Sequence, residues 1–198
     1  MPRWKIEVWL PLAVAAVSLA GALAWVRARA LPPPSLARVV AVDGAASSGG
    51  HAAARLAPGD AVGAGERLSV EDPPAASASA CLVLALPDGR TRVAVHGDVE
   101  LLQLRPLRLF LHEGAVAVDG AGSVLTREAD AATTDGRFTV RAGRGFARVD
   151  AARGTVAVEG RGKRSALGAD QHAEVAAPGV TPPAAPDPLA RLVNDRLR

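Results

Sequence analysis

A five-residue pattern, Val-Ala-Val followed by Asp, His or Glu and then Gly, occurs four times in this chain of 198 residues. The copies occupy residues 40–44, 93–97, 116–120 and 156–160. In each copy branched and small side chains alternate at a period of two, as in a β-strand, and the final glycine is typical of a tight turn. Unequal spacing excludes an exact repeat but permits stacked coils of varying length. We therefore predict a single all-β domain, either a β-solenoid or two packed sheets.

Similar strand-like runs continue along the chain, and turn residues separate them. No stretch between residues 38 and 175 has helical periodicity longer than three turns, whereas residues 44–50 and 71–79 are rich in Ala, Ser, Gly and Pro and are expected to be loops. The expected strands are 38–42, 61–62, 67–70, 81–86, 91–95, 100–104, 107–111, 115–118, 138–141, 146–149, 155–158 and 172–175. The residues expected to shape the turns are Gly59, Asp60, Gly65, Asp88, Gly89, Gly114, Gly120, Gly136 and Gly154.

The N-terminal segment has the pattern of a membrane anchor. Residues 10–26 carry no charged side chain, which is close to the minimum length for crossing a bilayer. Indole rings favour the membrane interface, and the run is flanked by residues suited to that position, namely Trp9, Trp25, Arg27 and Arg29. We predict a single-pass protein of the inner membrane whose bulk is periplasmic or extracytoplasmic. Residues 28–30 also have the small-x-small form of a signal-peptidase site, so cleavage is the alternative.

This anchor divides the chain into five predicted parts. They are a short cytoplasmic tail (1–9), the transmembrane anchor (10–26), a proline-rich spacer (27–37), the all-β domain (38–176) and a proline-rich tail with a short C-terminal helix (177–198). That helix would place Leu189, Leu192, Val193 and Leu197 on one face. Since so short a helix is not stable alone, it either frays or docks, and fraying is our prediction.

Composition argues against nucleic-acid binding. Aromatic residues make up only 3% of the chain and Tyr is absent, so platforms for stacking bases are missing. The net charge of +3 is spread along the chain. Its tightest basic cluster, Arg161, Lys163 and Arg164, is interpreted as a solvated basic turn.

The residue types that carry catalysis do not converge in the sequence. His51, His96, His112 and His172 lie in separate segments without metal-site spacing, and His96 is interpreted as a turn residue. Cys81 is the only cysteine, and its apolar surroundings predict a small buried hydrophobe. The aspartates Asp60, Asp88, Asp119 and Asp135 each adjoin a glycine, which a turn explains. We therefore predict no catalytic residue, metal or cofactor, and a binding or relay protein rather than an enzyme.

The order of these signals resembles the FecR-type periplasmic domain of membrane-anchored regulators associated with extracytoplasmic-function sigma factors. The matching runs are 56–68, 78–80, 82–90, 99–101, 107–118, 136–140, 149, 154–158 and 167–171. The resemblance implies an all-β sensing, relay or scaffolding module. Family members usually show Gly-Thr-x-Phe where this chain has Asp-Gly-Arg-Phe at 135–138, and about nine residues precede the anchor where family members carry a sigma-binding region. The expected partner is therefore a separate anti-sigma, envelope or regulatory membrane protein.

Two other functions share this layout. A single anchor before one all-β periplasmic domain also occurs in bridge proteins that pass lipopolysaccharide along a β-groove, although this similarity lies in the fold alone. A groove lined with Val and Leu would support that alternative, and a filled interior would count against it. A cell-wall-binding module is the third possibility, and it would have few aromatic rings for stacking on sugars.

Overall fold

The computed structural model describes residues 36–49, 54–71, 80–180, 195 and 197, all of which belong to the unit Ser35–Arg198. The expected cytoplasmic tail, the anchor with Trp9, Trp25, Arg27 and Arg29, and most of both proline-rich segments lie outside the described residues. Within the described part of the chain, no helix is long and apolar enough to cross a membrane.

The described fold consists of β-strands, and the predicted all-β class is confirmed. The strands are β1 (Ala37–Asp43), β2 (Ala45–Ser48), β3 (Ala54–Arg55), β4 (Ala61–Val62), β5 (Arg67–Glu71), β6 (Cys81–Ala85), β7 (Arg92–Leu104), β8 (Leu107–Leu125), β9 (Asp130–Gly143), β10 (Phe146–Arg153), β11 (Val156–Gly160), β12 (Lys163–Leu167) and β13 (His172–Ala176).

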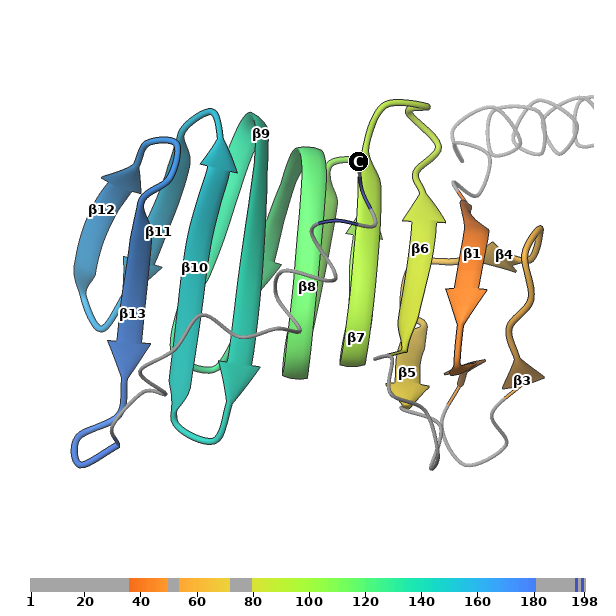
Figure 1. The fold of residues 1–198 in the computed structure, drawn as a ribbon, viewed down its shortest axis with the longest axis horizontal. Helices are drawn as coiled ribbons and strands as arrows, with labels where there is room; N and C mark the ends of the chain where they lie inside the picture. The colour runs from red at the N-terminus through yellow and green to blue at the C-terminus, as the bar shows by residue number, and fades with distance from the viewer. Residues whose placement is uncertain (1–35, 50–53, 72–79, 181–194, 196, 198) are drawn as a thin grey trace, which may run out of the picture. The chain divides into compact units, whose positions relative to one another are not determined.

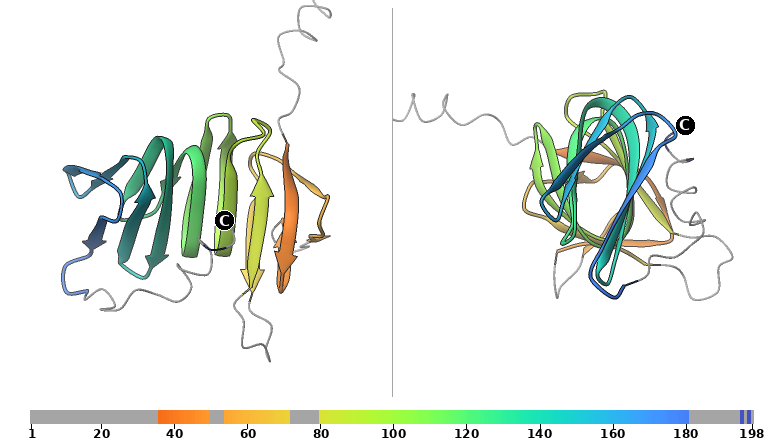
Figure 2. Two further views of the ribbon diagram at one scale, coloured as in Figure 1. Left: turned by 45° about the horizontal axis from the view of Figure 1, so that its top comes forward. Right: turned by 90° about the vertical axis from the view of Figure 1, so that its left-hand side faces the viewer.

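All of these strands join one antiparallel, hydrogen-bonded sheet. Its main path is β12-β11-β9-β8-β7-β5-β2-β3, while β6 bridges β7 and β1, and β10 bridges β9 and β13. Figure 1 shows the hairpins side by side, and the right-hand view of Figure 2, taken at a right angle to it, shows the sheet bending back over itself. The sheet does not close, because β12, β13, β3 and β4 each pair along one edge only. The domain is therefore one bent sheet and not two separate ones.

Two glycines allow the long strands to bend. The expected strands 91–95 and 100–104 merge into β7, and 107–111 and 115–118 merge into β8. At the points of merging, Gly97 and Gly114 are cross-strand partners with φ angles of 95° and 111°. A Cβ atom on Gly97 would lie 2.3 Å from the carbonyl oxygen of Glu113, and one on Gly114 would lie 2.2 Å from that of His96. The pentapeptide glycine therefore bends strand β7 instead of ending it.

Two predicted turns are wrong because their glycines also lie within strands. The sequence predicts turns at Asp119-Gly120 and Asp135-Gly136, but these dipeptides lie inside β8 and β9, where Gly120 and Gly136 are register partners. Gly120 has a positive φ of 124°, whereas Gly136 is not among the positive-φ glycines. A Cβ atom on Gly120 would lie 2.6 Å from Thr91 Oγ1, so close approach of another segment accounts for this glycine. Gly114 likewise belongs to strand β8 and not to a turn.

Strands β2 and β12 escape the sequence pattern, and of these β12 lies at an edge of the sheet. β2 occupies part of the expected loop at 44–50, and β12 contains Lys163 and Arg164 of the expected basic turn, so only Arg161 lies in the turn itself. Four of the five β12 residues are exposed. Because neither face of β12 is fully buried, its sequence has no apolar alternation to reveal it.

Leucine and valine side chains fill the space that the bent sheet encloses. Fully buried residues include Phe138, Leu68, Leu82, Leu84, Leu101, Leu109 and Leu111. Along β7 and β8 the valines of the pentapeptides belong to this core, whereas the alanines between them belong to a second buried cluster. That alternation positions the candidate site.

Candidate protein-docking site

The second buried cluster lies on the side of β6, β7 and β8 that faces away from the main core. We call it the alanine face, and its sheet residues are Cys81, Val83, Ala94, Ala115 and Ala117, with Ala41 packed against it. Ala94 and Ala117 are cross-strand partners, and each is the central alanine of a pentapeptide. Since side chains alternate across a strand, the valines on either side point into the main core and the alanines point out. The repeated motif thus builds a core and a docking surface together.

Leu197 covers the alanine face. Its side chain is 3% exposed and belongs to the same cluster as the alanines. The predicted fraying of the C-terminus is therefore wrong at this residue, because small side chains leave room for a leucine, whose burial stabilises by about 2 kcal/mol. The other residues expected on that helix face, Leu189, Leu192 and Val193, lie outside the described residues.

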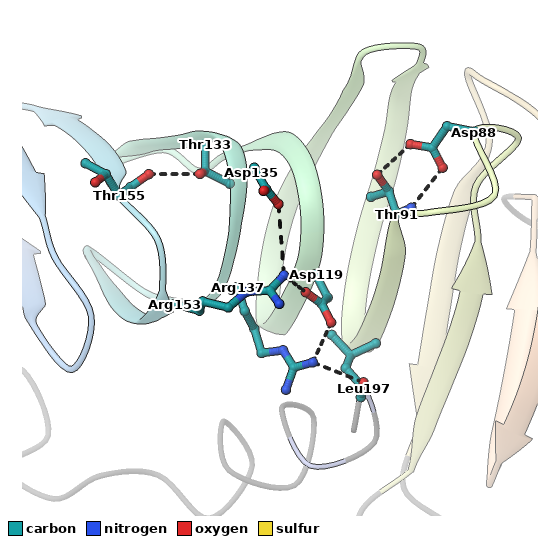
Figure 3. A network of polar contacts seen from close by, with 9 residues as sticks. All are labelled: Asp88, Thr91, Asp119, Thr133, Asp135, Arg137, Arg153, Thr155 and Leu197. Atoms are coloured by element: carbon teal, nitrogen blue, oxygen red, sulfur yellow. Dashed lines mark hydrogen bonds and ion pairs between the residues drawn. The ribbon is translucent and has the colours of Figure 1, made fainter.

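Arg137 in β9 borders the alanine face and holds the backbone of Leu197. Its Nη2 donates a hydrogen bond to the Leu197 carbonyl oxygen at 3.3 Å and forms an ion pair with Asp119, as Figure 3 shows. Arg153 donates to the other oxygen of Asp119 at 3.0 Å. The side chains of Arg137 and Asp119 are each only 19% exposed, so solvent screens this pair less than an ordinary surface pair.

A turn beside this border is fixed by Asp88. Its carboxylate accepts hydrogen bonds from the backbone N–H of Arg90 at 2.9 Å, from that of Thr91 at 2.8 Å and from Thr91 Oγ1 at 2.6 Å. Burial raises the pKa of Asp88, but these hydrogen bonds outweigh burial and hold the pKa below its usual value. Because Thr91 packs against Gly120, this turn is anchored next to Asp119.

The remaining predicted turn residues do not belong to the alanine face, and among them only Gly89 lies in the turn that Asp88 fixes. Gly59 and Asp60 precede β4, Gly65 lies between β4 and β5, Gly89 follows Asp88, and Gly154 lies between β10 and β11. All four of these glycines have positive φ angles. Asp60 Oδ2 accepts a hydrogen bond from the Ala57 N–H at 2.7 Å, which is a turn contact. These residues shape separate loops and form no common site.

The described histidines are dispersed. His96 lies within β7, not in a turn, and its Nδ1 donates to the Ala80 carbonyl oxygen at 2.8 Å. His112 Nε2 lies 3.6 Å from Glu100, and His172 is exposed on β13, while His51 lies outside the described residues. Among the residues that the structure describes, no group of three or more His, Cys, Asp or Glu side chains could hold a metal ion. Cys81 is 1% exposed, which confirms the prediction of a buried hydrophobe.

Sequence reasoning missed the two components that define the site. The alanine between two buried valines was visible in the repeated motif, but nothing local indicates that the outward side of a strand is covered. Arg137 and Asp119 lie in different strands and meet only through the pairing of β8 with β9. The one signal in the sequence was the small alanine side chain, which points to the face of the strand opposite the valines.

Comparison with known proteins gives only weak similarity. No family model matches, and no curated protein matches. Two crystal structures of a candidate anti-sigma factor from Parabacteroides distasonis ATCC 8503 are similar, one at 22% identity over 48% of this chain with a TM-score of 0.43, the other at 21% over 56% with a TM-score of 0.45. The match covers only 50% and 54% of those chains. Their name belongs to the regulatory class that the FecR-type resemblance implies, but similarity at this level does not show the family and carries no argument about function.

Proposed function

We propose that this chain is a periplasmic sensing, relay or scaffolding module of FecR type, tethered to the inner membrane by residues 10–26, that binds a protein partner. The partner is a separate anti-sigma factor or another envelope or regulatory membrane protein. The ordered FecR-like sequence signals supply the role, and the apolar run with its flanking tryptophans supplies the tether. The module binds and transmits, and it does not catalyse.

The alanine face is the observation that carries this proposal. It offers a shallow apolar seat for a leucine and, beside it, an arginine that donates to a backbone carbonyl group. An apolar centre with a polar border is the usual composition of a protein-binding surface. Any partner segment with a leucine-sized side chain and a free carbonyl group can make the same two contacts. Leu197 keeps the face covered until such a segment displaces it.

Two observations count against the other candidate functions. A lipid bridge needs an open groove, but Leu82, Leu101 and Phe138 in the interior are each 0% exposed, so the interior is filled. A polysaccharide module needs exposed aromatic rings, yet Phe110 and Phe146 are the only two described aromatic residues outside the fully buried core, and both are only partly exposed. Neither alternative has an observation in its favour.

Crosslinking from intact membranes tests the proposal. The full chain carries an affinity tag, membranes are crosslinked, and captured proteins are identified by mass spectrometry. Arg137→Gln removes the donor at the alanine face. Arg148→Gln is its matched control, because the Arg148 side chain is similarly shielded at 17% exposed and is also ion-paired, with Asp150 and Glu174.

We expect one envelope or regulatory protein to be recovered with the unmodified chain and with Arg148→Gln, and its recovery to fall with Arg137→Gln. Recovery of no envelope or regulatory protein would reject a partner-binding role. Equal recovery of the partner with both variants would support a partner-binding role but would show that the partner does not bind at the alanine face.

A further inference from the structure

The sheet has an open end at β12 and β13, separate from the alanine face. β12 pairs only with β11, and β13 only with β10, so each five-residue strand leaves one row of backbone donors and acceptors unpaired among the described residues. Figure 1 shows both strands at the same end of the sheet. A free edge of this kind can accept another strand.

Between these two strands lies a hollow of about 440 Å³. Val158 and Ser165 are cross-strand partners, and so are Gly160 and Lys163, which places Lys163 and Ser165 on the face of the sheet that the buried Val158 occupies. Val175 of β13 reaches across to Gly160, where an added Cβ atom would lie 2.9 Å from it. The hollow therefore has a floor of valine side chains and polar side chains at its mouth.

The charges around this mouth are unbalanced. Glu174 is already bound by Arg148 at 3.0 Å, and Glu159 is bound by Arg164 at 2.7 Å. Arg161 and Lys163 form no ion pair within the described part of the chain. Both acidic groups are thus neutralised, and two cations remain available beside the free edge.

We propose that the β12 edge binds an extended acidic segment of a partner protein by strand addition. The segment hydrogen-bonds to the unpaired backbone of β12 and, because its side chains alternate, presents carboxylates on the hollow side to Lys163 and, at the end of the strand, to Arg161, with small apolar side chains on the opposite face. Basic side chains on an edge strand also discourage pairing with the wrong chain. The same two charges that repel a basic strand select an acidic one. This inference does not depend on the relay role, since it concerns a different surface.

The test measures fluorescence polarisation of a labelled peptide with alternating Val and Glu, titrated with the full chain in detergent micelles. A Val-Lys peptide of equal length tests charge, and a Val-Glu peptide methylated at alternate backbone nitrogens tests strand pairing. We expect only the unmodified Val-Glu peptide to bind. Arg161→Gln with Lys163→Gln should weaken that binding about three- to tenfold, the range that two exposed ion pairs support.

Arg55→Glu is the control variant, because Arg55 is exposed on β3 at another free edge of the sheet. Its binding should equal that of the unmodified chain. Lys163→Gln alone should give an intermediate affinity. An unchanged melting temperature of the double variant would show that it is not misfolded.

Several results would overturn the proposal. Equal binding of the methylated peptide would reduce the site to a charge attraction without strand pairing. Equal binding of the Val-Lys peptide, an unchanged affinity in the double variant, or no measurable binding of the Val-Glu peptide would each reject the acidic strand. Displacement by millimolar pyrophosphate alone would assign the site to small anions instead.

Discussion

Replacing Gly97 by alanine should destabilise the domain far more than the same change at Gly89. Both glycines have positive φ angles, 95° at Gly97 and 70° at Gly89. At Gly97 the new Cβ atom would lie 2.3 Å from the carbonyl oxygen of Glu113 and 2.9 Å from the Cα atom of Gly114, which are backbone atoms of the paired strand. At Gly89 nothing lies within 4 Å.

The two positions therefore separate backbone strain from steric overlap. Left-handed strain costs about 1 kcal/mol at both sites. Overlap with a packed neighbour adds about 1 to 3 kcal/mol at Gly97 only. Since alanine reduces the entropy of the unfolded chain equally at both sites, that effect cancels in the comparison. For a domain of this size the expected fall in melting temperature is about 4–16 °C for Gly97→Ala and about 2–4 °C for Gly89→Ala.

Thermal unfolding of the full chain in detergent, followed by far-UV circular dichroism, measures the difference. Gly114→Ala should match Gly97→Ala, because its Cβ atom would lie 2.2 Å from the His96 carbonyl oxygen. If Gly97→Ala and Gly89→Ala lower the melting temperature equally, β7 and β8 do not approach as closely as described, and the explanation of the bend is refuted.

Three further predictions concern other parts of the chain. Leu197→Ala should lower the free energy of unfolding by about 2 kcal/mol in urea and raise the recovery of the partner protein. The control Leu102→Ala, at a residue that is 40% exposed, should do neither. No change with Leu197→Ala would mean that the alanine face is not covered. Burial raises the pKa of Asp130, the positive charge of Arg108 opposes this rise, and the negative charge of Glu159 adds to it. The folded state therefore favours the protonated carboxyl group. The stability that Asp130 contributes is complete below the unfolded pKa of about 3.9 and is lost as pH rises through the folded pKa. Asp130→Asn should therefore raise the urea midpoint at pH 7 and raise it less at pH 4, and a lower midpoint at pH 7 would contradict this assignment. The intact mass of protein extracted from membranes should include residues 1–30, and a loss matching that segment would show a cleaved signal instead of an anchor.

The sequence predicted strands well where one face is buried and the other is not. Alternation along residues 67–70 and 146–149 was sufficient, and β5 and β10 contain those runs. The sequence pattern could not distinguish a glycine that ends a strand from a glycine that bends a strand. Gly44 and Gly97 close the same pentapeptide, yet Gly44 joins two strands while Gly97 lies within β7. What differs is the pairing: β8 pairs with β7 on both sides of Gly97, whereas the partner strand changes from β6 to β5 at Gly44, and neither is written in the local sequence.

The candidate site could not be predicted from short stretches of the sequence, because its residues come together only in the folded sheet. Arg137 and Leu197 lie 60 residues apart in the sequence and meet only after the sheet has formed. The C-terminal residues show a helical pattern too short for stability alone, so fraying was the expectation. Docking at Leu197 depends on the alanines of β7 and β8, whose outward direction follows from strand register and not from composition.

The central claim, that this module binds a partner while tethered to the membrane, is tested most directly by separating it from its tether. The chain is deleted in its native host, and the strain is complemented either with the full chain or with residues 36–198 exported to the periplasm without the anchor. Transcription of the dependent genes is then measured in both strains, with the two proteins adjusted to equal abundance. A relay requires a connection across the bilayer, so we predict restoration by the full chain and none by the untethered domain. Full restoration by the untethered domain would contradict the relay and leave a soluble binding role.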